Sequence, residues 1–398
     1  MNDAVTVAGV VPAEVVTPRD LDELAEIVRE RYARGSRFAF VGGGTQLDLG
    51  NRPAALDTIV RTTALDRVID YTPEDQTITV EAGMTLGTLD RILAEAGQML
   101  PLDAGDRERG TVGGAIAANL AGRHRLRYGT VKDMIVGVAI VRPDGTPARG
   151  GGKVVKNVAG FDLPKLMVGS LGTLGAVATA TLRVYPVPET TAFVAGAFED
   201  DDGFVARDAA ALSASLVRER LEPVAMWAPS RPDGRYRVMV EFAGSRVAVE
   251  AQCRACERLI AESGVSARSC ASDGDEGERE TRARYAAAPR IKIGFAPASF
   301  AQLDELIRPL IDGDTTVLAY PGVGIAVIRP AASVDHRALL AAIRKREDMT
   351  AVVEAMPPQW TDVDAWGNPP RALRLMRALK TSFDPRGLCN PGRYVAGL

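Results

Sequence analysis

The chain has 398 residues, which is too long for one compact core, so at least two domains are expected. Its 48 Lys and Arg residues nearly balance 51 Asp and Glu residues, and the net charge of −3 disfavours nucleic acid as a main partner. Four cysteines, an N-terminus without a basic leader and the lack of a long apolar run indicate a cytoplasmic protein. Attachment to the inner face of the cell membrane through partner subunits stays open.

Helix and strand patterns alternate over residues 1–188. An amphipathic helix is expected from Thr17, which caps it, to Gly35, which ends it. A strand then leads into a glycine-rich turn, and further strands are expected at 57–60, 76–83 and 134–145, with a helix at 85–97. This order predicts an α/β region.

The pattern changes after residue 188. Residues 189–355 twice give the order βαββαβ, with helices at 203–220, 246–263, 299–311 and 333–346 and a polar, acidic stretch at 271–280. Such a duplication predicts an antiparallel sheet covered by helices, as in ferredoxin-like units. The last segment, 356–398, holds a helix at 370–382 and a Pro/Gly-rich tail that needs a docking surface. The whole chain is therefore predicted to be α+β.

Three glycine clusters lie within the first region. The turn "VGGGTQ" (41–46) follows a strand and can expose consecutive amides to phosphate oxygens, although a tight structural turn explains it equally well. The second cluster is "TVGGAIAANLAG" (111–122), and the third has glycines at 169, 172 and 175. Together the clusters favour an extended ligand with a pyrophosphate.

These motifs resemble the FAD-binding domain of the vanillyl-alcohol oxidase/p-cresol methylhydroxylase (PCMH) type of flavoproteins. Within that type, "LRYGTVKD", "GGKVVKNVAGFDLPKLMVGSLGTLG" and "LKTSFDPRGLCNPGRYVAGL" look like the E-subunit family of glycolate oxidases. The resemblance implies a PCMH-type domain of two α/β subdomains over 1–188 and a cap domain of two βαββαβ repeats over 189–355. It also implies that 356–398 returns to the FAD-binding domain.

The same resemblance implies a set of FAD contacts. They are Gly42, Gly43, Gly44, Thr45 and Gln46 in the pyrophosphate loop; Leu102, Asp103, Thr111, Val112, Gly113, Gly114 and Asn119 in a second stretch; Tyr128 and Gly129 bordering the site; Gly172, Gly175 and Val177; and Asn390 in the tail.

Two departures from related flavoproteins shape the functional expectation. The pyrophosphate loop contains no His or Cys to attach the flavin, so FAD is expected to be non-covalent. The chain has two histidines, His124 and His336, so it lacks the histidine cluster of related D-2-hydroxy-acid dehydrogenases and no metal site is expected. An incomplete alcohol-oxidising site fits a subunit that works beside a catalytic D-type flavoprotein and an iron–sulfur subunit in the oxidation of glycolate, a small 2-hydroxy acid, to glyoxylate.

Two other functions stay open: a free-standing FAD-dependent 2-hydroxy-acid dehydrogenase, and a non-enzymatic assembly module. In the first of these, Arg290 and Lys292, which alternate on one strand face, are the candidates for binding a substrate carboxylate. Ordinary solvated charges explain these two residues as well.

The remaining candidates also have two interpretations each. His124 belongs to a basic run, 123–127, that is a candidate docking surface; the histidine is either a surface or phosphate-side residue or a base. Lys153 and Lys156 pair with phosphate or with Asp162. Other residues are the Cys253/Cys256 pair, expected to be structural for want of a second pair that would complete a zinc site, and Asp133, which either approaches the flavin or caps a strand end.

Overall fold

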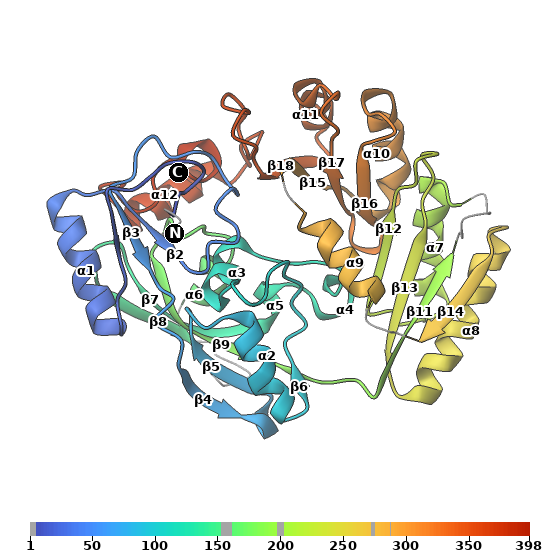
Figure 1. Ribbon diagram of the computed structural model, residues 1–398, viewed down its shortest axis with the longest axis horizontal. Coiled ribbons are helices and arrows are strands. Elements are labelled where there is room, and N and C mark those ends of the chain that lie inside the picture. The colour runs from blue at the N-terminus through green and yellow to red at the C-terminus, as the bar shows by residue number, and fades with distance from the viewer. Residues whose placement is uncertain (1–4, 153–160, 197–202, 272–274, 287) are drawn as a thin grey trace. The chain divides into compact units, whose positions relative to one another are not determined.

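The computed structural model describes residues 5–152, 161–196, 203–271, 275–286 and 288–398 (Figure 1). The chain forms two compact units, each treated separately below. The first comprises residues 1–121, 130–187 and 356–398, and the second comprises 122–129 and 188–355. Lys153 and Lys156 lie outside the described residues. Within the described parts of the chain, no helix is long and apolar enough to cross a membrane.

The first unit begins with a small parallel sheet of strand order β1-β3-β2. Helix α1 precedes β2, and its cap is Asp20, whose side chain accepts a hydrogen bond from the amide of Glu23, rather than the predicted Thr17. The helix ends, as predicted, at Gly35, which adopts a left-handed φ of 76°. The bounds are β1 (Glu14–Val16), α1 (Leu21–Arg34), β2 (Phe38–Val41) and β3 (Thr58–Arg61).

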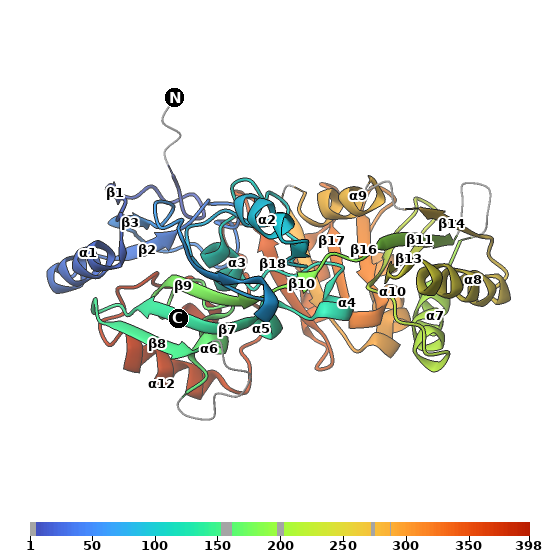
Figure 2. The same cartoon turned by 90° about the horizontal axis from the view of Figure 1, so that it is seen from below.

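The second sheet of this unit is antiparallel and has the order β4-β5-β9-β7-β8 (Figures 1 and 2). Leu24 and Val28 of α1 pack with Phe38, Val60 and Val141 in one buried cluster that joins the two sheets. The five strands are β4 (Val68–Thr72), β5 (Thr77–Glu81), β7 (Ile135–Val141), β8 (Pro147–Gly151) and β9 (Ala176–Arg183), and a short pair is formed by β6 (Gln98–Met99) and β10 (Tyr185–Pro186).

Short helices and one longer C-terminal helix complete the first unit. Thr85 caps α2 as predicted, and Thr111 caps α3 by accepting a hydrogen bond from the amide of Gly114. Helix α12 lies at the edge of the unit (Figure 2). These helices are α2 (Leu86–Glu95), α3 (Val112–Ala118), α5 (Val131–Met134), α6 (Leu163–Met167) and α12 (Leu373–Phe383).

The second unit is built on an eight-stranded sheet of order β14-β11-β13-β12-β16-β17-β15-β18. Two successive βαββαβ repeats supply these strands, as the sequence pattern predicts. The first repeat is β11 (Thr190–Gly196), α7 (Ala206–Arg218), β12 (Ala225–Pro229), β13 (Val238–Gly244), α8 (Arg246–Glu262) and β14 (Ala267–Ala271). The second is β15 (Arg290–Gly294), α10 (Phe300–Ile307), β16 (Thr316–Tyr320), β17 (Ile325–Arg329), α11 (His336–Arg344) and β18 (Thr350–Ala355).

One helix of this unit was missed by the sequence pattern. The polar stretch expected at 271–280 contains the start of α9 (Asp275–Arg284), which lies across the strands from α7 and α8 in both views (Figures 1 and 2). The many charged residues of this stretch are typical of an exposed loop, but two of them are buried in the helix: Glu280 is 3% exposed and Arg284 is 4% exposed. Their ion pairs, described below, explain how so polar a helix packs on a sheet.

Candidate functional site: a glycine-lined cofactor cavity

A large cavity lies in the first unit where the carboxyl end of β2 meets the amino end of α3. It encloses about 860 Å³, including space open to solvent. Its lining comes from three separate segments and the tail: Val7, Ala39, Phe40, Val41, Gly42, Gly43, Gly44, Thr45, Gln46, Leu47 and Thr62; Thr111, Gly113, Gly114, Ala117 and Ala118; Ser170, Leu171, Gly172, Gly175, Ala176 and Val177; and Asn390 and Arg393. All three predicted glycine clusters therefore contribute to one cavity.

The turn after β2 presents unused hydrogen-bond donors to this cavity. Among the residues that the structure describes, the backbone amides of Gly42, Gly43, Gly44 and Thr45 have no acceptor. Successive free amides at the carboxyl end of a strand form a concave, electropositive surface suited to phosphate oxygens. This geometry supports the phosphate-binding interpretation of "VGGGTQ".

Sterics explain two of the glycines in this turn. A Cβ on Gly43 would lie 1.6 Å from the carbonyl oxygen of Arg109, and one on Gly42 would lie 2.1 Å from Thr111 Oγ1. The turn therefore packs directly against residues 109–111, and only glycine permits that approach. The missing side chains serve the contact between two loops, which in turn keeps the free amides in place.

The glycine pair of α3 differs from that turn. The amide of Gly113 donates to the carbonyl of Ala82 over 2.7 Å, and the amide of Gly114 donates to Thr111 Oγ1 over 3.1 Å. These amides are already satisfied, so the pair contributes a smooth wall to the cavity rather than phosphate donors. The phosphate-binding capacity is concentrated in the turn at 42–45.

The C-terminal tail supplies the two polar side chains at the cavity that are buried with an unpaired atom. Asn390 is 5% exposed, and its Oδ1 has no partner among the described residues, although its Nδ2 donates to the carbonyl of Leu171. Its backbone φ of 46° is left-handed, a conformation that asparagine tolerates. A buried acceptor without a donor indicates a missing ligand group.

Arg393 places a buried cation beside the same cavity. Its guanidinium donates to the carbonyls of Leu47, Leu49, Gly50 and Asn51, whereas its Nε has no partner within the described part of the chain. Burial lowers the pKa of Arg393 to about 10, and the charge of Asp48 offsets only part of this effect. An anionic ligand would compensate this buried charge.

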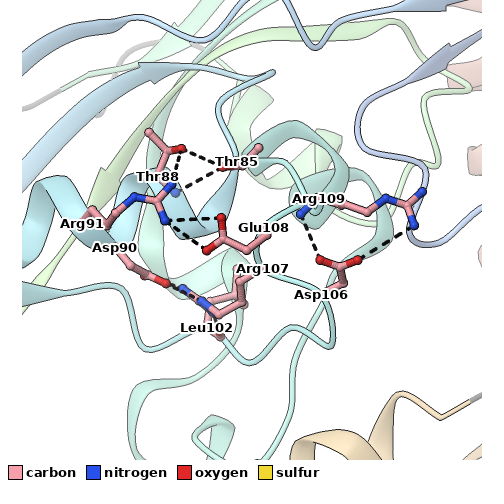
Figure 3. Close-up of polar contacts among 9 residues, drawn as sticks. All are labelled: Thr85, Thr88, Asp90, Arg91, Leu102, Asp106, Arg107, Glu108 and Arg109. Atoms are coloured by element: carbon pink, nitrogen blue, oxygen red, sulfur yellow. Dashed lines mark hydrogen bonds and ion pairs between the residues drawn. The ribbon is translucent and has the colours of Figure 1, made fainter.

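Polar contacts brace the loop between α2 and α3 (Figure 3). Arg107 forms an ion pair with Asp90 of α2 and donates to the carbonyl of Leu102, and Arg91 bonds Glu108 over 3.1 Å. Arg109 donates to the carbonyl of Gly43 over 3.4 Å. These bonds hold the loop against the glycine turn.

Twelve of the predicted contact residues line the cavity, and six do not. Leu102 and Val112 instead line a small apolar cavity of about 240 Å³. Asp103, the residue after Leu102, is buried but does not line the FAD cavity. Asn119 ends α3 with a left-handed φ of 50°. Tyr128 and Gly129 belong to the segment 122–129, which is part of the second unit.

Several lining residues were not predicted. Phe40, Ser170 and Leu171 flank predicted positions, so a wider window around each motif would have included them. Arg393 was missed although it stands three residues after Asn390 in the quoted tail, and its position in the sequence alone gives no sign of burial. Asp133 caps the short helix α5 with Thr130 and has no place in the lining of the cavity.

Part of the basic run 123–127 is buried within the second unit. Arg123 has a side chain only 13% exposed, and it bonds Glu241 and Glu280 over 3.1 Å each. His124 lies 3.6 Å from the second oxygen of Glu241, and Arg127 pairs with Glu222. The expectation of a docking surface is therefore wrong for Arg123, because its guanidinium forms ion pairs with Glu241 and Glu280 inside the second unit.

Arg290 and Lys292 converge on a carboxylate of the same unit. Arg290 Nε lies 3.4 Å, and Lys292 Nζ 2.8 Å, from Glu354 on β18, while Arg284 of α9 also bonds that carboxylate. A β-bulge makes this possible: Arg290 pairs with Ala355 and Ile291 with Val353, so Glu354 is the extra residue. The solvated-charge interpretation is wrong for Arg290, which is 5% exposed.

Electrostatics reinforce this closed cluster. Burial alone would raise the pKa of Glu354, but the charges of Arg284 and Lys292 hold it well below its usual range. The carboxylate therefore stays ionised and keeps its cations engaged.

Throughout the described ranges, no group of three or more His, Cys, Asp or Glu side chains could hold a metal ion. Cys253 and Cys256 are buried in α8, and burial raises the pKa of Cys256 to about 12.

Comparison with known proteins supports FAD as the cofactor. Residues 12–151 match the model of the FAD binding domain, and residues 366–394 match the C-terminal domain of FAD linked oxidases. Over these residues the chain is similar to FAD-linked oxidases. FAD is thus the cofactor, and the free amides, the orphaned oxygen of Asn390 and the buried Arg393 fit its pyrophosphate and polar groups.

The curated relatives of the chain are named as oxidase subunits and dehydrogenases. Glycolate oxidase subunit GlcD of Bacillus subtilis (strain 168) is 24% identical over 97% of this chain and 89% of the relative. D-2-hydroxyglutarate dehydrogenase of Xanthomonas citri pv. viticola is 28% identical over 96% of this chain and 89% of the relative. Glycolate oxidase subunit GlcE of Escherichia coli (strain K12) is 41% identical, over 31% of this chain and 36% of the relative.

Solved structures share the fold of the chain. p-Cresol methylhydroxylase with substrate bound superposes with a TM-score of 0.73 at 15% identity, over 97% of this chain and 89% of that one. An alkyldihydroxyacetonephosphate synthase structure gives a TM-score of 0.70 over 95% of this chain and 75% of that one, also at 15% identity. The PCMH-type fold predicted from the sequence is therefore confirmed.

Proposed function

We propose that this chain is the FAD-binding subunit of a heteromeric glycolate oxidase. In this role it holds FAD in the glycine-lined cavity and works beside a catalytic D-type flavoprotein and an iron–sulfur subunit. The observation that carries the proposal is the Glu354 cluster: the two candidate cations for a substrate carboxylate, Arg290 and Lys292, are both engaged by it. A chain that binds FAD while its cap cations are neutralised internally fits a subunit better than a complete dehydrogenase.

The relatives support the same choice. The most identical of the three relatives described above is named as an E subunit of glycolate oxidase, and its similarity is confined to about a third of the chain. The few histidines add to the argument, since His124 lies 3.6 Å from Glu241 and is not among the residues that line the FAD cavity. A base matched to the operating pH is a usual requirement for oxidising an alcohol.

The chain's own residues would hold FAD without a covalent bond. No His or Cys is among the residues that line the cavity in the described part of the chain. The amides of 42–45 bind and orient the pyrophosphate, Asn390 accepts a hydrogen bond through Oδ1, and the satisfied amides of Gly113 and Gly114 leave a wall that excludes water. Bound FAD supplies reversible uptake of two electrons.

A free-standing FAD-dependent 2-hydroxy-acid dehydrogenase is the second candidate. It is favoured by the whole-length similarity to D-2-hydroxyglutarate dehydrogenase. Under that alternative, Lys292, whose side chain is 36% exposed, would have to exchange Glu354 for the substrate. An assembly module without redox function is the third candidate, and it requires that bound FAD never change its oxidation state.

Purification from the native source with a tag on this chain separates the candidates. The proposal predicts flavin in the chain and co-purification of a second flavoprotein and an iron–sulfur protein. Recovery of the flavin-loaded chain alone, with turnover of 2-hydroxy acids, would establish the free-standing dehydrogenase instead. Flavin that no substrate reduces, even in the complete assembly, would leave only the assembly module.

A further inference from the structure

One wall of the FAD cavity is a loop with an unusual backbone. Ser170, Leu171 and Gly172 of this loop line the cavity. Leu171 has a φ of 50° and Gly172 a φ of 69°, so two successive residues are left-handed. A side chain such as that of Leu171 is strained in this region, and a strained backbone persists only where surrounding contacts hold it. The shape of this wall therefore depends on the bonds that the loop makes.

The C-terminal segment supplies those bonds. The three successive carbonyls at 171–173 each accept a hydrogen bond from a different side chain of that segment. The pairs are Asn390 Nδ2 with Leu171, Cys389 Sγ with Gly172 over 3.1 Å, and Lys380 Nζ with Thr173 over 2.8 Å. Burial raises the pKa of the Cys389 thiol to about 12, so the thiol keeps the proton that it donates. Lys380 and Cys389 are not among the residues that line the cavity, so they act on it through the loop.

Lys380 on α12 is the junction of this arrangement. Its side chain is 11% exposed, and the three N–H groups of its ammonium are all used. Nζ donates to the carbonyl of Thr173, to the carbonyl of Cys389 over 2.8 Å and to Asp384 Oδ2 over 2.7 Å. Asp384, whose side chain is fully buried, also accepts hydrogen bonds from the amides of Leu388 and Cys389. One buried ion pair thus ties the helix, the loop and the tail together.

The same junction fixes the backbone next to Asn390. Lys380 bonds the carbonyl of the peptide group that joins Cys389 to Asn390, and the amide of that group donates to the carbonyl of Phe38 over 2.6 Å. A peptide group that is bonded at both of its polar atoms is held in one orientation. The bond from Nδ2 to Leu171 then fixes the side chain. Asn390 Oδ1, which has no partner among the described residues, is thereby held at the cavity wall.

We propose that Lys380, paired with Asp384, is a positioning residue for FAD. It holds the loop 171–173 and the peptide group before Asn390 in place, so that Oδ1 of Asn390 stays available to the cofactor. The alternative is that Lys380 only stabilises the fold. A positioning role makes the effect of Lys380 on FAD affinity depend on Asn390, whereas a general effect on stability does not. The proposal concerns cofactor binding alone, so it applies to each of the three candidate functions.

A double-mutant cycle on FAD affinity tests this dependence. Lys380→Met removes the charge and the three bonds but keeps an unbranched side chain. Titration of the apoprotein with FAD, followed by flavin fluorescence, is carried out for Lys380→Met, Asn390→Gly and the double variant. Each single change is expected to weaken FAD binding by roughly tenfold. The double variant should lie within about threefold of Asn390→Gly, because the two residues act through the same contact. Losses that multiply to about a hundredfold would overturn the proposal, and so would parental affinity in Lys380→Met.

A second variant keeps the test decisive if Lys380→Met does not fold. Lys380→Met leaves Asp384 as a buried carboxylate without its cation, which is strongly destabilising. Combining Lys380→Met with Asp384→Asn removes both charges, but the carbonyls of Thr173 and Cys389 still lose their donor. This variant should show the same loss of FAD affinity and the same dependence on Asn390. If it binds FAD as tightly as the parent chain, Lys380 is not a positioning residue.

Arg31→Met in α1 is the matched control. Arg31 is a cation of the first unit with a side chain 10% exposed, it pairs with Glu14 over 2.8 Å, and it does not line the FAD cavity. Thermal melting should show a loss of stability in both Lys380→Met and Arg31→Met, whereas FAD affinity should fall in Lys380→Met alone. A comparable loss of FAD affinity in Arg31→Met would show that cofactor binding follows general stability, which contradicts the proposal.

Discussion

Lys292 donates through Nζ to Oε1 of Glu354 over 2.8 Å, and this contact changes how the cap sequence is understood. The strand pattern "RIKIGF" suggests two cations free to bind a substrate carboxylate. The bulge in β18 instead brings a carboxylate of the chain to the same face. The second unit therefore contains a closed ionic cluster where an open anion site was one of the expectations.

Glu354→Gln is expected to destabilise the second unit strongly. The change leaves Arg284 and Arg290 buried beside a neutral amide, and breaking a buried ion pair typically costs about 3–5 kcal/mol. Chemical denaturation of the variant measures the loss. Asp348→Asn, which breaks the solvent-exposed pair with Arg346, is the matched control and should leave the stability nearly unchanged. Equal losses of stability in the two variants would show that the ion pairs of Glu354 do not stabilise the second unit.

Acid should destabilise the second unit through its buried carboxylates. Burial raises the pKa of Glu241, but His124 and Arg123 lower it by more, so the net pKa lies below its usual value. The pKa of Glu354 also lies below its usual value. A depressed carboxyl pKa stabilises the fold fully above the unfolded value of about 4.5 and progressively less as the pH falls below it. Thermal melting between pH 7 and 3 should therefore show a fall that begins near that value. A second-unit transition that is independent of pH throughout this range would contradict the assignment.

Gly43→Ala is expected to damage the phosphate-binding turn. The added methyl group would meet the carbonyl oxygen of Arg109, so the turn must move and its free amides with it. Flavin content of the purified variant should fall by about tenfold or more, comparable to the loss of more than one hydrogen bond to a charged group. Gly152→Ala is the matched control, because a Cβ there meets nothing within 4 Å. Full flavin occupancy in Gly43→Ala would remove this turn from the binding site.

Asn390→Gly tests the tail's contribution to FAD binding. Glycine keeps the left-handed backbone of Asn390 but removes the buried Oδ1, and FAD affinity is expected to fall by roughly tenfold, the value of about one hydrogen bond. Asn119→Gly is matched in backbone conformation and lies off the cavity, so its affinity should stay within about twofold of the parent. Titration of the apoprotein with FAD, followed by flavin fluorescence, measures both. A larger loss in Asn119→Gly would restore that residue to the site and argue against the tail.

The sequence predicted the elements well where the signal was local. The stop at Gly35, the cap at Thr85 and both βαββαβ repeats follow from periodicity and turn chemistry within a few residues. Helix α9 was missed because its charged residues are typical of a solvent-exposed loop. The sequence does not show that Glu280 pairs with Arg123, which lies in a distant segment of the chain. Local patterns report propensity, whereas burial of a charge depends on residues far away in the chain.

The site was predicted in part for the same reason. Glycine turns are visible in sequence, and their convergence on one cavity follows from the fold. The difference between the free amides of 42–45 and the satisfied amides of Gly113 and Gly114 depends on the carbonyl of Ala82, which no motif reveals. The partnership of Arg290 with Glu354 spans 64 positions and requires a bulge, so spacing along one strand could not anticipate it.

The most direct test of the account is an anaerobic titration of the purified, flavin-loaded chain with glycolate, followed in the visible absorbance band of FAD. Because the Glu354 cluster engages the candidate cations, we expect the oxidised spectrum to persist with the chain alone and to bleach when the complete assembly is present. Rapid bleaching of the isolated chain by glycolate would contradict the account and identify a self-sufficient dehydrogenase.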